Sequence, residues 1–226
     1  MNRILASKWA KLAVFLLGMT PAVIPVWQAF RVIQFHVNPL DYFTANPIEF
    51  ITHYTGDWTL RFLLITLAIT PLRGIFNAPA ITRHRRMIGL YAFFYGCLHL
   101  LTWVWPDRQF SPSGMWEDVA ERTYITLGMA AFLAMVPLAA TSTVGWVRRL
   151  GFHRWKRVHR LIYITALAGC LHYLWLVKSD IRLPLMYIAI LAVLFGYRLV
   201  VKARDTVKAQ RRKAARSRPA PQETAS

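Results

Sequence analysis

The stretch from Arg85 to Trp103 reads RRMIGLYAFFYGCLHLLTW, and it carries the pattern that decides the fold. Two arginines precede an apolar run, which is typical of a helix that enters a membrane from its basic side. His99 lies 12 residues after Met87, deep in that run, where an ionisable side chain is costly and usually functional. The stretch therefore predicts a membrane helix that presents an imidazole inside the bilayer.

The end of this stretch recurs later in the chain. Residues 96–99 and residues 169–172 both read GCLH, and both copies lie in apolar surroundings. A single histidine in a membrane helix sometimes does no more than hydrogen-bond a neighbouring helix. For either copy taken alone, that interpretation stays open. Two matching copies favour a shared function. The glycine three residues before each histidine leaves room on the face that the imidazole overhangs.

Apolar stretches of this kind occur six times in the 226 residues, of which 56% are hydrophobic. Each approaches the ~20 residues that cross a bilayer, and such a span satisfies its backbone in lipid only as a helix. The sequence thus predicts an all-α integral membrane protein, a six-transmembrane-helix bundle forming one domain over residues 1–201. The predicted spans are residues 9–33, 58–76, 87–105, 124–141, 159–177 and 184–201.

The basic residues orient this bundle. Of 28 lysines and arginines, 22 fall on one side: three before the first span, four between spans two and three, six between spans four and five, and nine from Arg198 onward. The positive-inside rule places that side in the cytoplasm, with both termini inside (N-in, C-in). The rule also explains the net charge of +18 without nucleic acid as a partner. Residues 202–226 have the composition of a disordered, basic cytoplasmic tail near anionic lipid headgroups.

On this topology the third and fifth spans are parallel, and both repeated histidines lie ~18–20 Å from the cytoplasmic end. Two imidazoles at one level can hold a flat group between them. Two trans histidines suffice to ligate a haem iron, whereas zinc usually takes four ligands, and Cys97 and Cys170 point to other helix faces. The sequence therefore favours a b-type haem with His99 and His172 as axial ligands.

Two further histidines precede the repeats on the cytoplasmic side. His159 stands 13 residues before His172, a rise of ~20 Å that suits a second, inner haem. Thirteen residues at ~100° each also turn to another helix face, so a bend would be required. His159 is a candidate ligand, which leaves the number of haems at one or two. His84 lies in an arginine-rich stretch, where a solvated histidine is the default expectation.

Three stretches together resemble a known family: residues 85–103, residues 122–142 (RTYITLGMAAFLAMVPLAATS) and residues 154–178 (RWKRVHRLIYITALAGCLHYLWLVK). They are similar to the MsrQ (YedZ) family of haem-binding membrane subunits, and more broadly to ferric reductase-like transmembrane domains. The resemblance covers about residues 10–200. It implies b-type haem and FMN as cofactors, with His99, His159 and His172 as haem ligands.

The same resemblance implies a function. Such a subunit sits in the bacterial inner membrane and takes electrons from the quinone pool or from a cytosolic flavin reductase. It passes them to a periplasmic molybdenum subunit, MsrP, which reduces methionine sulfoxide in oxidised periplasmic proteins. The sulfoxide chemistry would then belong to the partner, and whether this chain is itself an enzyme is left open.

Motifs that the sequence lacks narrow the alternatives. It has no G-x-G-x-x-G dinucleotide fingerprint and no nucleophile–base constellation for hydrolysis, so an external electron donor is expected. One alternative is a stand-alone ferric or quinone reductase of the same fold. Another is a non-redox transporter or scaffold, although transporters typically show broken helices and polar residues at mid-membrane.

The outer connection, residues 105–122, is a candidate docking surface for the electron acceptor. It carries four acidic residues, Asp107, Glu117, Asp118 and Glu121. A solvated loop without a partner is an equally good interpretation.

Overall fold

The computed structural model describes residues 2–36 and 38–216, and for residues 213–216 it describes the backbone alone. Throughout these ranges the regular structure is helical, without a strand. In chain order the helices are α1 (Asn2–Leu5), α2 (Lys8–Phe35), η1 (Pro39–Asp41), α3 (Pro47–Ile75), η2 (Pro79–His84), α4 (Arg85–Thr102), η3 (Trp103–Asp107), α5 (Pro112–Glu121), α6 (Thr123–Ala140), α7 (Val144–Val158), α8 (Leu161–Leu176) and α9 (Arg182–Arg216). The predicted all-α class is confirmed for this part of the chain.

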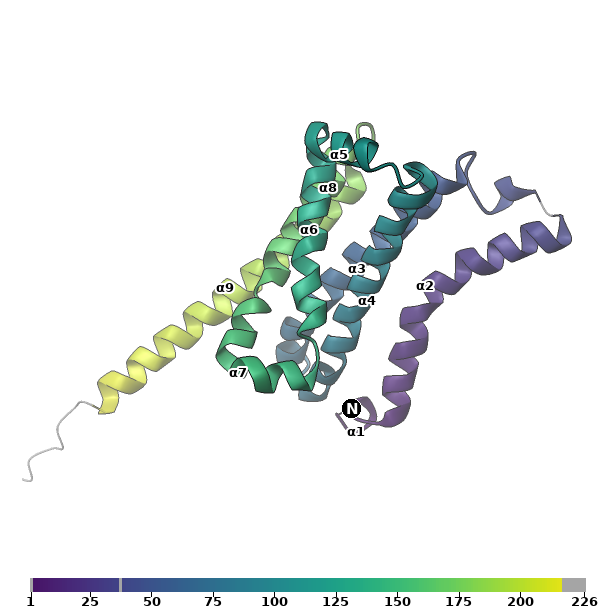
Figure 1. Cartoon of the computed structure of the whole chain (residues 1–226). Helices are drawn as coiled ribbons and strands as arrows, with labels where there is room; N and C mark the ends of the chain where they lie inside the picture. Colours follow the sequence, from purple (N-terminus) through teal and green to yellow (C-terminus); the bar gives the residue numbers. More distant parts are fainter. Residues whose placement is uncertain (1, 37, 217–226) are drawn as a thin grey trace, which may run out of the picture.

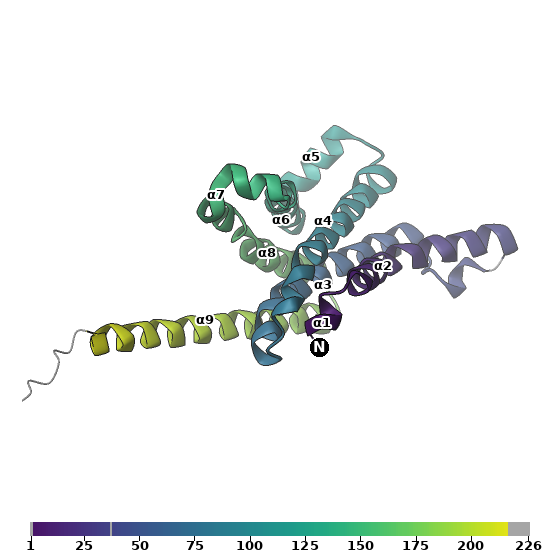
Figure 2. The same cartoon turned by 90° about the horizontal axis from the view of Figure 1, so that it is seen from below.

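Four helices form the centre of the molecule, with α3 packed on α4 and α6 packed on α8. Helices α2 and α9 flank them, and the short helices α5 and α7 cross opposite ends of the group (Figure 1). Viewed from below, α9 projects well beyond the other helices on one side (Figure 2). The N-terminal residues lie at the same end as α7, which is the end that carries most of the basic residues.

Five helices in the described ranges are long and apolar enough to cross a membrane, so the chain is a multi-pass membrane protein. They correspond to the first, second, third, fourth and sixth predicted spans. The fifth predicted span is α8, whose 16 residues rise only ~24 Å, less than the ~30 Å hydrocarbon core. The count of six spans and the N-in, C-in orientation remain predictions.

Helix α3 begins 11 residues before the predicted start of its span at residue 58. Asn46 caps its N-terminus by accepting a hydrogen bond from the backbone N–H of Glu49, and Pro47 occupies the first turn, where a missing N–H is harmless. The polar residues of the first turns concealed this part of the helix from a hydropathy reading. The extension matters because these turns line the site described below.

Two further differences concern the basic end of the molecule. The connection between α6 and α8 forms α7, which was not predicted and which breaks at Gly151, where φ is +71°. Helix α9 continues to Arg216, whereas a disordered tail was predicted from residue 202. Alanine, lysine, arginine and glutamine dominate this segment, and their high helix propensity favours continuation. Residues 217–226 of the predicted tail lie outside the described residues.

Aromatic side chains of α3 and α4 build the core and hold α2 against it. The ring of Phe62 lies 5.3 Å from that of Tyr95 and 5.4 Å from that of Tyr91, centroid to centroid. The hydroxyls of the two tyrosines donate to α2 carbonyls, Tyr91 to Phe15 (2.7 Å) and Tyr95 to Gly18 (2.9 Å). A Cβ at Gly18 would collide with the Tyr91 ring, so α2 approaches α4 only because this residue is glycine.

Replacing Gly18 by alanine should therefore destabilise the protein by about 1–3 kcal/mol, because the Tyr91 ring must shift to admit the methyl group. The measurement is thermal or denaturant unfolding of the full chain in detergent. Gly196→Ala is the matched control: it makes the same change inside a helix, but nothing lies within 4 Å of the added Cβ. That variant should be neutral or up to about 1 kcal/mol more stable. Equal effects of the two substitutions would contradict the close approach.

Candidate functional site

A cavity of about 260 Å³ lies between α3, α4, α6 and α8, in the half of the bundle that α5 covers. His99 of α4 and His172 of α8 both line it, as the sequence repeat predicted that they would face one site. Cys97 and Cys170, the other notable residues of the repeats, are absent from its lining, and Cys170 is fully buried in the core. The histidines therefore share the cavity, and the cysteines pack elsewhere.

The His99 ring is fixed by the neighbouring helix α3. Its Nδ1 lies 2.8 Å from the backbone carbonyl oxygen of Thr52, and the ring rests on Gly56, four residues further along α3. A Cβ built on Gly56 would stand 3.0 Å from His99 Cε1. The glycine thus lets the imidazole lie against the α3 backbone and reach a carbonyl that a side chain would otherwise obstruct.

His172 repeats this arrangement in the second half of the bundle. Its Nδ1 lies 2.6 Å from the carbonyl oxygen of Tyr124 in α6, and a Cβ on Gly128 would stand 2.7 Å from that same nitrogen. Tyr124 and Gly128 have the same four-residue spacing as Thr52 and Gly56. The duplication noticed in the histidine helices therefore extends to their partner helices, where the sequence shows no obvious similarity.

The hydrogen bonds determine which nitrogen of each ring is available. A carbonyl oxygen can only accept, so Nδ1 carries the proton in both rings and Nε2 keeps its lone pair. Metal-ligating histidines show this pattern, in which the second nitrogen donates to a carbonyl and fixes the ring. Each of the two histidines is thus prepared to offer Nε2 to a metal.

The two rings also stand at a suitable separation. Their centroids are 6.1 Å apart and their planes are inclined at 78°. A metal–nitrogen bond of about 2 Å on each side, together with the half-width of each ring, gives about the same separation for two imidazoles on one ion. The donor set and the spacing fit a planar metal macrocycle between the rings, and one glycine from each of the four helices lines the cavity.

One wall of the cavity is polar, and it breaks the symmetry between the two halves. The residues that follow Thr52 and Gly56 are His53 and Asp57, whereas apolar residues, Ile125 and Met129, occupy the corresponding positions on α6. Asp57 pairs with Arg61 at 3.4 Å, one turn further along α3, and Arg61 donates to the hydroxyl of Tyr187 at 2.9 Å. The sequence analysis did not identify these polar residues of α3. The pattern that could have revealed them is the four-residue spacing of Glu49, His53, Asp57 and Arg61, which places them on one helix face.

His159 lies apart from the cavity. It follows the last residue of α7, where its Nε2 is 3.1 Å from the hydroxyl of Thr141 and its ring lies 4.1 Å from that of Trp155. His84, expected to be solvated, is instead 5% exposed, and its Nε2 bonds the carbonyl of Leu5 at 2.9 Å. That expectation is wrong because α1 folds back over η2 and covers the ring.

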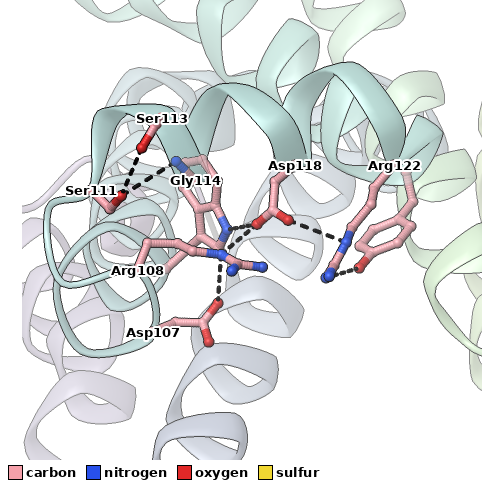
Figure 3. Close-up of polar contacts among 9 residues, drawn as sticks. Asp107, Arg108, Ser111, Ser113, Gly114, Asp118 and Arg122 are labelled. Atoms are coloured by element: carbon pink, nitrogen blue, oxygen red, sulfur yellow. Dashed lines mark hydrogen bonds and ion pairs between the residues drawn. The ribbon is translucent and has the colours of Figure 1, made fainter.

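A buried carboxylate organises the connection that covers the α5 end of the cavity (Figure 3). Asp118 of α5 is 4% exposed and forms ion pairs with Arg108 and with Nε of Arg122, the latter at 3.2 Å. It also accepts from the Trp103 indole at 3.3 Å. Trp103 and Arg122 line the cavity, so Asp118 fixes α5 to the cavity mouth. The hydroxyl of Tyr124, followed by the Asp118 carboxylate, raises the pKa of Arg122, which keeps that guanidinium charged.

These contacts revise the docking hypothesis for residues 105–122. Asp118 is buried, so it serves the structure of the connection itself, whereas Asp107 is exposed although it lies 3.8 Å from Arg108. Glu117 and Glu121 are exposed and remain candidates for contact with another protein.

Comparisons with known proteins identify the family of this chain. Residues 55–170 match the family model described as "Ferric reductase like transmembrane component", a range that contains both cavity histidines' partner glycines and His99. The chain is 47% identical over 215 residues to "Protein-methionine-sulfoxide reductase heme-binding subunit MsrQ" of Xanthomonas oryzae pv. oryzae, covering 95% of this chain and 94% of that protein. Proteins with the same description from Bordetella pertussis (50% over 167 residues; 73% and 81% covered) and Ralstonia nicotianae (46% over 191; 84% and 84%) are also similar.

Replacing Asp118 by asparagine should loosen α5. The change leaves Arg108 and Arg122 without their shared carboxylate, which we expect to cost about 1–3 kcal/mol, since both guanidiniums are partly solvated. Hydrogen–deuterium exchange should rise in residues 112–121, and the thermal midpoint should fall. Glu117→Gln is the control, because that exposed residue lies on the same helix and should change stability by less than about 0.5 kcal/mol. Unchanged exchange in Asp118→Asn would argue against the role of this carboxylate.

Proposed function

The chain belongs to the ferric reductase-like transmembrane family and, within it, to the MsrQ subunits, and from this membership we propose that it is the haem-binding electron-transfer subunit of a bacterial methionine sulfoxide reductase system. The observation that carries the proposal is the pair of cavity imidazoles, each donating from Nδ1 to a backbone carbonyl and keeping Nε2 for a metal. A haem bound there would supply one-electron transfer. The residues of the chain would bind the haem, orient the imidazole rings and exclude water.

Those residues have definite roles. His99 and His172 would hold the haem iron, and the carbonyls of Thr52 and Tyr124 would fix the orientation of both rings and increase the basicity of Nε2. The apolar lining, which includes Leu63 on α3, would exclude water from the faces of the macrocycle. Thr165 is the one lining residue of the described chain with a fully buried hydroxyl that has no hydrogen-bond partner, and it offers a donor to a group in the cavity.

His159 is proposed as a ligand of a second haem near the basic end. Support comes from its distance from the cavity and from the resemblance to the family. The Thr141 hydroxyl now occupies its Nε2, so ligation would require that hydrogen bond to be exchanged. FMN is proposed as a further cofactor on the family resemblance alone, and no residue is assigned to it.

The electron route follows from the proposed orientation. With residues 1–201 as the membrane domain of an inner-membrane protein and both termini in the cytoplasm, the cavity would lie in the periplasmic half. Electrons would come from the quinone pool or a cytosolic flavin reductase and leave towards the molybdenum subunit MsrP near α5. Reoxidation of the quinol-reduced protein only in the presence of that partner would distinguish this route from a stand-alone ferric or quinone reductase.

Substituting either cavity histidine by alanine should remove the haem, because neither ring alone provides two axial nitrogens. The measurement is the reduced-minus-oxidised absorbance spectrum of protein purified from haem-sufficient cells. His153→Ala is the control, since that side chain is exposed on α7 and should leave the spectrum unchanged. Gly128→Ala should give an intermediate result, because its methyl group displaces the His172 ring. A colourless wild-type preparation, or full haem content in His99→Ala, would defeat the proposal.

Substituting His159 by alanine tests the second haem separately. If His159 ligates an inner haem, the haem-to-protein ratio should fall by about half while the spectrum of the remaining haem persists. The ratio is measured by the pyridine haemochrome method against total protein. An unchanged ratio would remove His159 from the ligand set and leave one haem, held by His99 and His172.

A further inference from the structure

At the basic end of the bundle, a groove runs between the end of α3, the start of α8 and the middle of α9. Its polar lining consists of Thr70, Tyr163, Tyr197, Arg198, Lys202, Asp205 and Thr206. Thr70 is 14 residues beyond Gly56 along α3, which places the groove ~21 Å from the histidine cavity. It is therefore a separate site, and the function proposed above makes no use of it.

Arg198 is the fixed element of this groove. Its Nη2 donates to the carbonyl of Leu67 at 2.6 Å, a carbonyl whose usual partner four residues later is Pro71, which has no N–H. Its Nη1 donates to the hydroxyl of Tyr163 at 3.2 Å, and its guanidinium lies 5.3 Å from that ring's centroid. The side chain is thus held in one place, and its buried Nε has no hydrogen-bond partner in the described part of the chain.

The charge in the groove is not balanced by the protein. Arg198 and Lys202 form no ion pair with any carboxylate among residues 2–36 and 38–216, although Asp205 lies in the same groove. Arg85, at the start of α4, is close enough for its charge to interact unfavourably with that of Arg198, and it too lacks a carboxylate partner there. The two cations of the groove, Arg198 and Lys202, therefore face a single acid, Asp205, and Arg85 adds a positive charge beside the groove.

The hydroxyl groups of the groove add further hydrogen-bond donors for a ligand. Tyr163 accepts from Arg198, so its own hydroxyl hydrogen is available to a ligand. Thr70 and Tyr197 form no side-chain hydrogen bond within the described ranges. A rigid guanidinium, a flexible ammonium and several hydroxyl donors make a combination that suits the oxygens of a phosphate group.

We propose that this groove binds a phosphate group, and that in the membrane this is the headgroup phosphate of an anionic phospholipid. The position of the groove along the bundle supports a lipid as the source of the phosphate. The groove lies at the basic end, where lipid headgroups would contact the helices. Basic pockets between transmembrane helices on the cytoplasmic side bind anionic headgroups in the same way. The apolar surface of α9 beside it, including the exposed Leu199, can contact the acyl chains.

The test is lipid binding to the delipidated full chain in detergent, followed by native mass spectrometry. The probes are dioctanoyl-phosphatidylglycerol, dioctanoyl-phosphatidylcholine with the same chains, and inorganic phosphate. The wild type should bind phosphatidylglycerol about fivefold more tightly than phosphatidylcholine. Inorganic phosphate that displaces the lipid at millimolar concentration would show that free phosphate also occupies the site. Binding of the lipid without such displacement would assign the site to lipid alone.

Variants locate the binding in the groove. Lys202→Gln should weaken phosphatidylglycerol binding about fivefold, because it removes one positive charge from the lining of the groove. Lys208→Gln is the control, since it removes the same charge from α9 outside the groove. Arg198 is left intact because it also supports the α3 backbone. Equal lipid affinity in the wild type and in Lys202→Gln, or an equal loss in Lys208→Gln, would overturn the proposal. Haem content is unaffected by either result, so the proposed function is tested independently.

Discussion

The structure depends on a hydrogen bond that occurs twice, from an imidazole Nδ1 to a carbonyl of a neighbouring helix, α3 for His99 and α6 for His172. It sets the tautomer of both histidines, turns their remaining nitrogens into the cavity and keeps the rings 6.1 Å apart. It is possible only where the helices approach closely, which explains the glycines at positions 56 and 128. Helix packing and ligand geometry are therefore one constraint, and a change in either would alter the other.

The α3–α4 pair and the α6–α8 pair share this geometry but differ in polarity. The two sides of the cavity are therefore chemically different. The α6 side is apolar, whereas the α3 side carries His53 and Asp57 and continues to Arg61. Ionisable side chains inside a membrane protein cost free energy and usually have a function. We therefore expect His53 and Asp57 to interact with the group that occupies the cavity. A macrocycle with an apolar and a polar edge would enter in one orientation. The outer cover held by Asp118 then encloses it.

Much of this could be predicted from the sequence, because lipid permits few ways to satisfy a backbone. The helical class, the approximate spans and the convergence of His99 and His172 all follow from hydropathy and from the repeated GCLH. The carbonyl partners could not be foreseen, since any residue supplies a carbonyl. The burial of Asp118 also escaped a linear reading, because charge counts do not reveal which carboxylate two arginines share. For His159, the helix face and its partner depend on the bend between α7 and α8, which composition does not encode.

The acceptors for both ring nitrogens belong to the main chain, and this has a consequence for how the site can change over time. Threonine occupies one acceptor position and tyrosine the other, with equivalent geometry. A substitution at these two positions leaves the acceptor in place, whereas a side chain at the glycine four residues later would meet the imidazole ring. The site is therefore more sensitive to substitution at Gly56 and Gly128 than at Thr52 and Tyr124. An alignment read only for polar side chains would overlook the residues that matter most.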